Sequence, residues 1–141
     1  MIISHIIGGL GNQMFQYALG RHLSLKFKTE FKLDTWDYKW YKVHDYGLHY
    51  YFIKAGLAQP NEVLDLKTHP IVRPFMRKSS HIIERGMPFD PQVLDSGDNV
   101  YLEGYWASEQ YFKPISEVIR NDLELQIPLS ESTQFILKEI R

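Results

Sequence analysis

The chain has 141 residues, of which 44% are hydrophobic and 14% aromatic, a length and composition typical of one globular domain. It contains no cysteine, which excludes disulfides, thiolate zinc sites and cysteine nucleophiles. Sixteen Lys and Arg against seventeen Asp and Glu give a formal net charge of −1, which argues against a general nucleic-acid binder.

The first predicted element is a short buried strand over residues 1–7, because this stretch is rich in β-branched residues and apolar on both faces. A glycine-rich turn follows, and the next apolar residues recur at the spacing of a helix that packs on a sheet. Asn12 is the expected N-cap of this helix. Residues 29–34 predict a second strand, which completes a β-loop-α-β unit of the Rossmann type.

The turn between the first strand and the helix carries glycine at positions 8, 9 and 11. Glycine lets the backbone approach a ligand closely, and a helix N-terminus presents unpaired N–H groups to an anion such as a diphosphate. A tight turn without any ligand is the structural alternative. Three glycines between a buried strand and an amphipathic helix favour a loop that faces a ligand.

A dinucleotide cofactor is one candidate ligand for this loop. Gly9 and Gly11 align with the first two glycines of G-x-G-x-x-G, but Met14 stands where the third glycine should be. Asp34 ends the second predicted strand, near the place of a ribose-binding acid in such folds. An oxidoreductase that binds NAD is therefore kept as an alternative function.

Three later segments carry further hypotheses. Residues 36–52 hold many aromatic side chains, for which packing is a better explanation than sugar stacking. Arg73, Arg77 and Lys78 form a basic segment that suggests peripheral contact with anionic lipid, although a solvated loop explains it as well. Residues 130–141 predict a helix.

Without a signal peptide or an apolar run of about 20 residues, we expect a cytoplasmic protein, peripheral at most to the inner face of the membrane.

Two stretches resemble glycosyltransferase family 11, the α-1,2-fucosyltransferases. The first is residues 6–21 (IIGGLGNQMFQYALGR) together with 32–34 (KLD). The second is residues 89–91 (FDP) and 99–106 (NVYLEGYW), which continues into 108–112 (SEQYF). The resemblance covers essentially the whole chain, with a looser match between residues 36 and 87.

The resemblance implies an α/β fold, a Rossmann-like half of a two-domain enzyme of the GT-B type. It implies inverting, metal-independent transfer of L-fucose from GDP-fucose to the 2-hydroxyl of a galactose-terminated glycan. GDP-fucose is the donor substrate, and no cofactor is expected. The loop beside the diphosphate and fucose would consist of Gly8, Gly9, Gly11, Asn12 and Gln13. Tyr105 and Trp106 end a predicted strand and are weaker candidates for contacts with a sugar.

The sequence also departs from this family. The His-x-Arg-Arg-x-Asp motif of its members, whose arginines are expected to stabilise the leaving GDP, is absent from residues 1–141. We therefore expect residues 1–141 to be the acceptor-side domain, cut before the C-terminal donor-binding domain and inactive alone. A non-catalytic carbohydrate-binding module is a further alternative.

No catalytic residue and no metal site is assigned from the sequence. The six histidines show no spacing typical of metal ligands. Several carboxylates are candidates for the base that deprotonates an acceptor hydroxyl, and nothing in the sequence separates them. They include Asp34, Asp37, Asp45, Asp90 and Glu103.

Overall fold

The computed structural model describes residues 1–67, 80–86, 89–126 and 130. The strands are β1 (Ile2–His5), β2 (Phe31–Asp34), β3 (Gly56–Leu57), β4 (Ser80–Ile83) and β5 (Val100–Glu103). The α-helices are α1 (Leu10–Phe27), α2 (Pro60–Lys67) and α3 (Ser116–Asp122). Five short 3-10 helices join them: η1 (Trp36–Lys39), η2 (Leu48–Tyr50), η3 (Pro91–Asp95), η4 (Glu109–Tyr111) and η5 (Lys113–Ile115). The basic segment 73–78 lies outside the described residues, and so does all but Ser130 of the helix expected over 130–141.

The five strands form one parallel sheet in the order β3-β2-β1-β5-β4. Ile2 pairs with Phe31 on one side and with Val100 on the other, so β1 is the central strand. The predicted β-loop-α-β unit is confirmed, although β1 and β2 are shorter than expected. A mixed α/β chain with an all-parallel sheet is compatible with a Rossmann-like fold.

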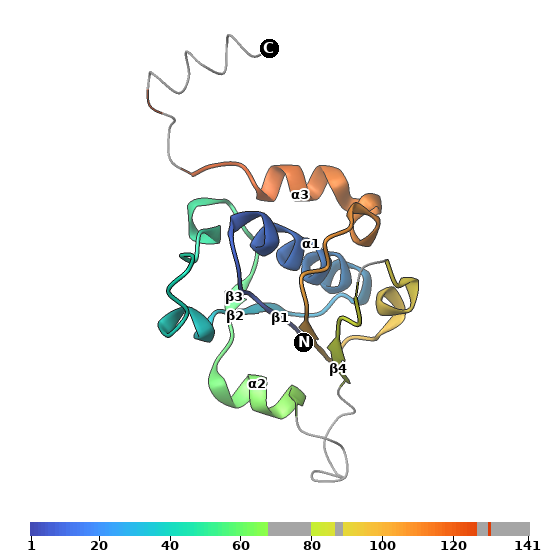
Figure 1. Ribbon diagram of the computed structural model, residues 1–141. Helices are drawn as coiled ribbons and strands as arrows, with labels where there is room; N and C mark the ends of the chain where they lie inside the picture. Colours follow the sequence, from blue (N-terminus) through green and yellow to red (C-terminus); the bar gives the residue numbers. More distant parts are fainter. Residues whose placement is uncertain (68–79, 87–88, 127–129, 131–141) are drawn as a thin grey trace.

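Helices cover both faces of this sheet. Helices α1 and α3 lie on one side and α2 on the other (Figure 1). Because side chains alternate along a strand, β1 sends Ile2 into the core beneath α1 and Ile3 into a smaller core beneath α2. Both isoleucines are fully buried, as expected of a central strand.

One glycine controls how closely α1 approaches the sheet. A Cβ atom at Gly20 would lie 2.3 Å from the Phe31 ring and 2.4 Å from Ser4 Oγ, so helix and strands meet there without room for a methyl group. In the dinucleotide fingerprint the third glycine has this packing role. Here Met14 occupies that position and Gly20, further along the same helix, permits the contact.

A buried polar network joins α1 to α3. Asp122 Oδ2 accepts hydrogen bonds from the Tyr17 hydroxyl at 2.7 Å and from Arg21 Nε at 2.8 Å. The Tyr17 oxygen also accepts from the backbone N–H of Lys54 at 3.0 Å. Burial, together with the hydrogen bond to Asp122, raises the pKa of Tyr17, so its hydroxyl stays a neutral donor.

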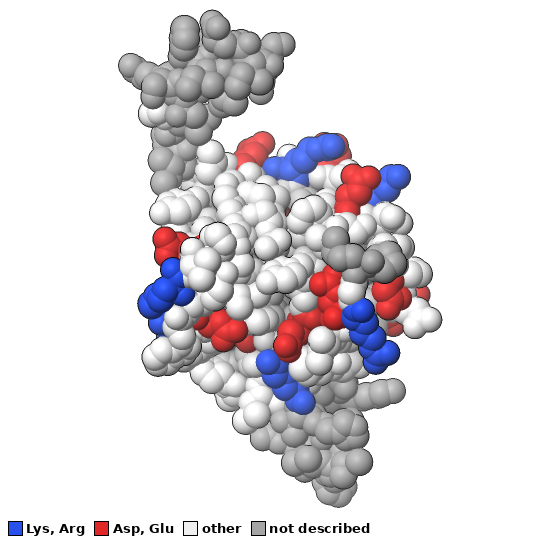
Figure 2. Space-filling model, in the orientation of Figure 1, with Lys and Arg blue, Asp and Glu red and all other residues white. Residues whose placement is uncertain are grey.

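The surface carries charges of both signs. On the face seen in Figure 2, basic and acidic side chains lie interspersed around an area that is largely uncharged. Among the described helices, none is long and apolar enough to cross a membrane.

Candidate functional site

The loop between β1 and α1 turns at Gly8, whose φ is +86°. A left-handed conformation of this kind strains any side chain, so glycine is required there. Helix α1 begins at Leu10 with Gly9 as its N-cap, which corrects the expectation that Asn12 caps the helix. Asn12 lies inside the first turn because the reversal at Gly8 starts the helix earlier than the sequence pattern indicates.

The N-terminus of α1 has the properties of an anion site. Gly9 provides no side-chain cap, and the first turn holds no acidic residue. The first N–H groups of a helix have no intrahelical acceptor, and the helix dipole adds positive potential there. Gly11 lies exposed in this turn, and a Cβ added to it would have no atom within 4 Å, so Gly11 is not part of the tight turn.

Two glutamines of α1 fasten this loop to its neighbours. Gln13 is fully buried, and its Nε2 donates to Gly8 O and Asp45 O, each at 2.9 Å. Its Oε1 accepts from the N–H of Gly47 at 2.9 Å. The amide of Gln13 is therefore used within the protein, and the prediction that it faces the donor is replaced by a role in positioning the loop.

Sequence reasoning missed the second glutamine. The fully buried Gln16 accepts from the N–H of Ile7 and donates to Gly104 O, both at 3.1 Å, and so ties the end of β1 to the end of β5. Gln16 lies three residues after Gln13, on the same side of the helix. This spacing of two glutamines within residues 6–21 is the feature of the sequence that could have predicted the role of Gln16.

Aromatic side chains border the loop. The Tyr38 hydroxyl donates to Gly8 O at 2.7 Å, and burial raises the pKa of Tyr38. A Cβ at Gly8 would lie 3.3 Å from the Tyr105 ring, and one at Gly9 would lie 3.7 Å from the His44 ring. Tyr105, half exposed, thus lies beside the glycine loop as expected from its place at the carboxyl edge of the sheet.

The turn after β5 is built by Glu84. Its carboxylate accepts from the N–H of Tyr105 at 2.7 Å and from that of Trp106 at 3.0 Å. This bidentate contact holds Trp106 at a φ of +54°, a conformation that is uncommon outside glycine. Trp106 is 1% exposed, so it does not face the open edge as Tyr105 does.

Most candidate bases already have partners. Asp34 is buried and accepts from the Tyr101 hydroxyl at 2.7 Å. Asp37 Oδ2 lies 2.7 Å from His5 Nε2. Burial opposes ionisation of Glu103, but its hydrogen bond with His81 and the nearby charge of Lys67 hold its pKa below the ordinary value. The carboxylates of Asp34, Asp37 and Glu103 are therefore all engaged within the described part of the chain, and the geometry singles out none of these three as a base.

The remaining carboxylates are placed as follows. Asp90 caps η3 by accepting from the N–H of Gln92. The backbone carbonyl of Asp45 is an acceptor for Gln13. Within the described part of the chain, no group of three or more His, Asp or Glu side chains is arranged to hold a metal ion.

The positioning role of Gln13 is testable. Gln13→Leu removes three hydrogen bonds. The carbonyl of Gly8 keeps the Tyr38 hydroxyl as a donor, but the carbonyl of Asp45 and the N–H of Gly47 lose their side-chain partner, so we expect a loss of about 2–3 kcal/mol in the free energy of unfolding. Urea denaturation measures this loss. Asn12→Leu is the control, since the side chain of Asn12 makes no hydrogen bond to the described residues, and should change stability by less than about 0.5 kcal/mol. Equal effects of the two substitutions would contradict the assignment.

Comparison with known proteins gives a distant relative. The chain is 28% identical over 127 residues to an alpha-1,2-colitosyltransferase of Escherichia coli. The match covers 85% of this chain and 43% of the relative, so the chain spans less than half the length of that protein. No family model and no solved structure matches the chain. The relative is a glycosyltransferase, the class of enzyme that the sequence motifs indicate.

Proposed function

We propose that this chain is part of a glycosyltransferase that uses a sugar-nucleotide donor, with the Gly8–Gly9 loop beside the donor's diphosphate. The observation that carries the proposal is the N-terminus of α1, which has neither a side-chain cap nor an acidic residue and opens beside Tyr105. A diphosphate would accept hydrogen bonds from the free N–H groups of this turn. The similarity to a colitosyltransferase supports the same class of reaction.

The finer proposal is inverting transfer of L-fucose from GDP-fucose to the 2-hydroxyl of a galactoside, in an enzyme of the GT-B type. It rests on the resemblance of residues 6–21 and 99–112 to the α-1,2-fucosyltransferases. In this proposal Gly8, Gly9 and Gly11 let the donor approach the backbone, and the Asn12 amide offers a donor and an acceptor to a sugar or phosphate. Half-exposed Tyr105 forms one wall of the donor site.

The structure disfavours the dinucleotide alternative. The Asp34 carboxylate, which would have to bind a ribose hydroxyl, is 7% exposed and accepts from the Tyr101 hydroxyl and the N–H of Trp36. A ribose would have to displace these bonds at a cost of about 1–3 kcal/mol each.

Binding of GDP-fucose distinguishes the proposed glycosyltransferase from an oxidoreductase that binds NAD. In an NMR titration with GDP-fucose we expect shifts in the amides of Gly8, Gly9 and Tyr105, with a dissociation constant in the range of about 1 mM for an incomplete site. Tyr105→Ala should weaken this binding about tenfold. Trp40→Ala, which removes another exposed aromatic side chain (80% exposed), should leave it unchanged.

Two outcomes would reject the proposal. One is tighter binding of NAD than of GDP-fucose, which would favour the oxidoreductase. The other is that no sugar nucleotide shifts the amide signals of the glycine loop, which would show that these residues do not bind the donor.

A further inference from the structure

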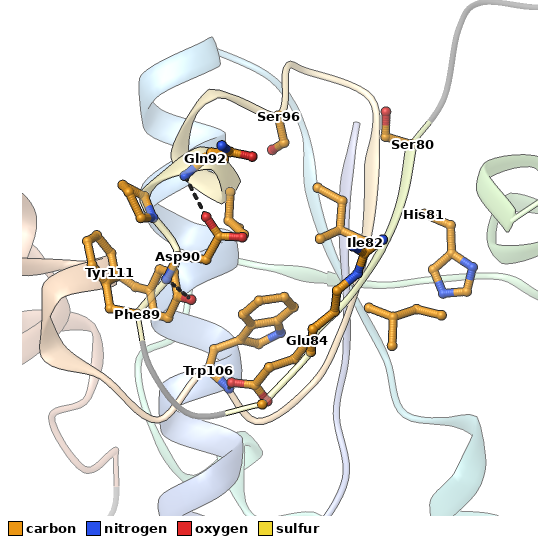
Figure 3. A pocket seen from close by; sticks show the side chains of 15 residues that line it. Ser80, His81, Ile82, Glu84, Phe89, Asp90, Gln92, Ser96, Trp106 and Tyr111 are labelled. Carbon is orange, nitrogen blue, oxygen red and sulfur yellow. Dashed lines mark hydrogen bonds between the residues drawn. The ribbon is translucent and has the colours of Figure 1, made fainter.

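A second concave region lies at the β4 edge of the sheet, apart from the glycine loop. It is a cavity of about 840 Å³ between β4 with residues 84–86 on one side and the segment 89–96 on the other. The Trp106 indole lies between these two walls (Figure 3). Its lining includes Glu84, Phe89, Asp90, Ser96, Trp106 and Tyr111.

Two residues that line this cavity carry a buried polar atom without a partner. Trp106 Nε1 and Ser96 Oγ are buried and make no hydrogen bond within the part of the chain that the structure describes. Trp106 as a whole is 1% exposed. A buried polar atom without a partner is costly, and a water or ligand that supplies the missing hydrogen bond removes that cost. One indole N–H donor and one hydroxyl, which can donate or accept, match a ligand with several hydroxyl groups.

The other walls define the chemistry of that ligand. Phe89 and Tyr111 pack edge to face with ring centroids 4.8 Å apart, and Trp106 packs against Tyr111 in the same way at 5.7 Å. Trp106 and Tyr111 are buried in this cluster, and the partly exposed Phe89 offers an apolar surface to a ligand face that carries only C–H groups. The wall therefore suits a molecule with one apolar face and a hydroxylated rim.

The charges disfavour an anion in this cavity. Glu84 and Asp90 contribute two carboxylates against the single guanidinium of the exposed Arg85. Glu84 is engaged with the backbone of Tyr105 and Trp106, and Asp90 Oδ1 accepts from the N–H of Gln92 at 2.9 Å. A diphosphate would be repelled here, in contrast to the N-terminus of α1.

We propose that this cavity binds a neutral pyranose, and that the sugar is the acceptor of the transfer reaction; the acceptor role rests on the proposed function. Tyr105 and Trp106 are consecutive in one turn held by Glu84. Tyr105 borders the glycine loop and Trp106 lines the cavity, so this turn separates a site for the anionic donor from a site for the neutral acceptor.

The indole N–H resonances report directly on this cavity. The chain has three tryptophans: Trp36 Nε1 donates to Ala58 O, Trp40 is 80% exposed, and Trp106 lies in the cavity. Titration of the whole chain with methyl β-D-galactopyranoside should shift the Trp106 indole signal, with a dissociation constant of about 1–10 mM, and leave the other two in place.

Two serine variants test the contact. Ser96→Ala should weaken the galactoside about fivefold without lowering stability, because its hydroxyl has no partner to lose among the described residues. Ser24→Ala is the matched control, since Ser24 is also buried but its hydroxyl donates to Arg21 O outside the cavity. It should leave galactoside binding unchanged. Equal affinity of the wild-type chain and Ser96→Ala would overturn the proposed contact.

The same spectra separate this proposal from the proposed function. If the galactoside shifts Trp106 while GDP-fucose leaves Gly8 and Gly9 unmoved, the sugar site stands and the donor function fails. If GDP-fucose moves the loop while no sugar moves Trp106, the donor function stands and the sugar site is overturned. Shifts of Trp106 by L-fucose or GDP rather than by the galactoside would overturn the assignment to the acceptor.

Discussion

Gly20→Ala is expected to destabilise the protein by about 2 kcal/mol, although alanine is the better helix former by about 1 kcal/mol. The added methyl group would lie 2.3 Å from Phe31 Cε2 and 2.4 Å from Ser4 Oγ. Phe31 is 6% exposed and Ser4 is fully buried, so neither side chain can move aside without disturbing the sheet. The measurement is the free energy of unfolding from urea denaturation.

Gly11→Ala is the matched control on the same helix. No atom lies within 4 Å of a Cβ at this position, so the substitution should leave stability unchanged or raise it by up to about 1 kcal/mol. Phe31→Leu in the Gly20→Ala background should recover part of the loss, because a smaller side chain relieves the contact. A neutral Gly20→Ala would show that α1 does not depend on this close approach.

Asp122→Ala is expected to cost about 3 kcal/mol, because it removes the shared acceptor of the network between α1 and α3. The Asp122 side chain is 6% exposed, and Arg21, at 18%, would keep its charge without a carboxylate beside it. Tyr17 would lose the acceptor of its hydroxyl as well. Urea denaturation again measures the loss, and hydrogen exchange should show α3 opening more often than in the wild-type chain.

Glu117→Ala provides the comparison within α3. Glu117 pairs with Arg120, and both side chains are more than two-thirds exposed, so its loss should change stability by less than about 0.5 kcal/mol. If Asp122→Ala lowered the free energy of unfolding as little as Glu117→Ala does, the buried network would contribute no more to stability than an exposed ion pair. The link between α1 and α3 would then depend on apolar packing around Ile119 alone.

Part of the candidate site could be predicted from residues close together in the sequence. Gly8 and Gly9 lie in the turn between β1 and α1, where the strand pattern and the glycines placed them. Tyr105 follows β5 at the carboxyl edge of the sheet, as predicted from the strand that precedes it. These predictions held because each depends on chain direction and on a local pattern.

The roles of individual side chains in the site required the tertiary structure. The sequence predicts a ligand-facing amide at Gln13, but the segment 45–47, far away in the sequence, takes up its hydrogen-bonding groups. From the sequence, Tyr105 and Trp106 are equivalent candidates for sugar contacts, but in the structure Trp106 is buried and Tyr105 is half exposed. The turn that places them is held by Glu84, which comes from the loop after β4. Neither contact leaves a pattern in the sequence, because each joins residues that only the sheet brings together.

Local sequence patterns are enough to predict the β-loop-α-β unit, the parallel pairing of β1 with β2 and the glycine turn between strand and helix. Hydrophobic periodicity and glycine are local signals, and parallel strands need a crossover connection, which a helix between two strands provides. Three other features are visible only in the folded chain: β5 lies beside β1, Gly20 sets the distance from α1 to the sheet, and Gln16 joins the two strand ends. These features depend on strand order and on the depth of packing, which are properties of contacts between distant residues and of no single segment.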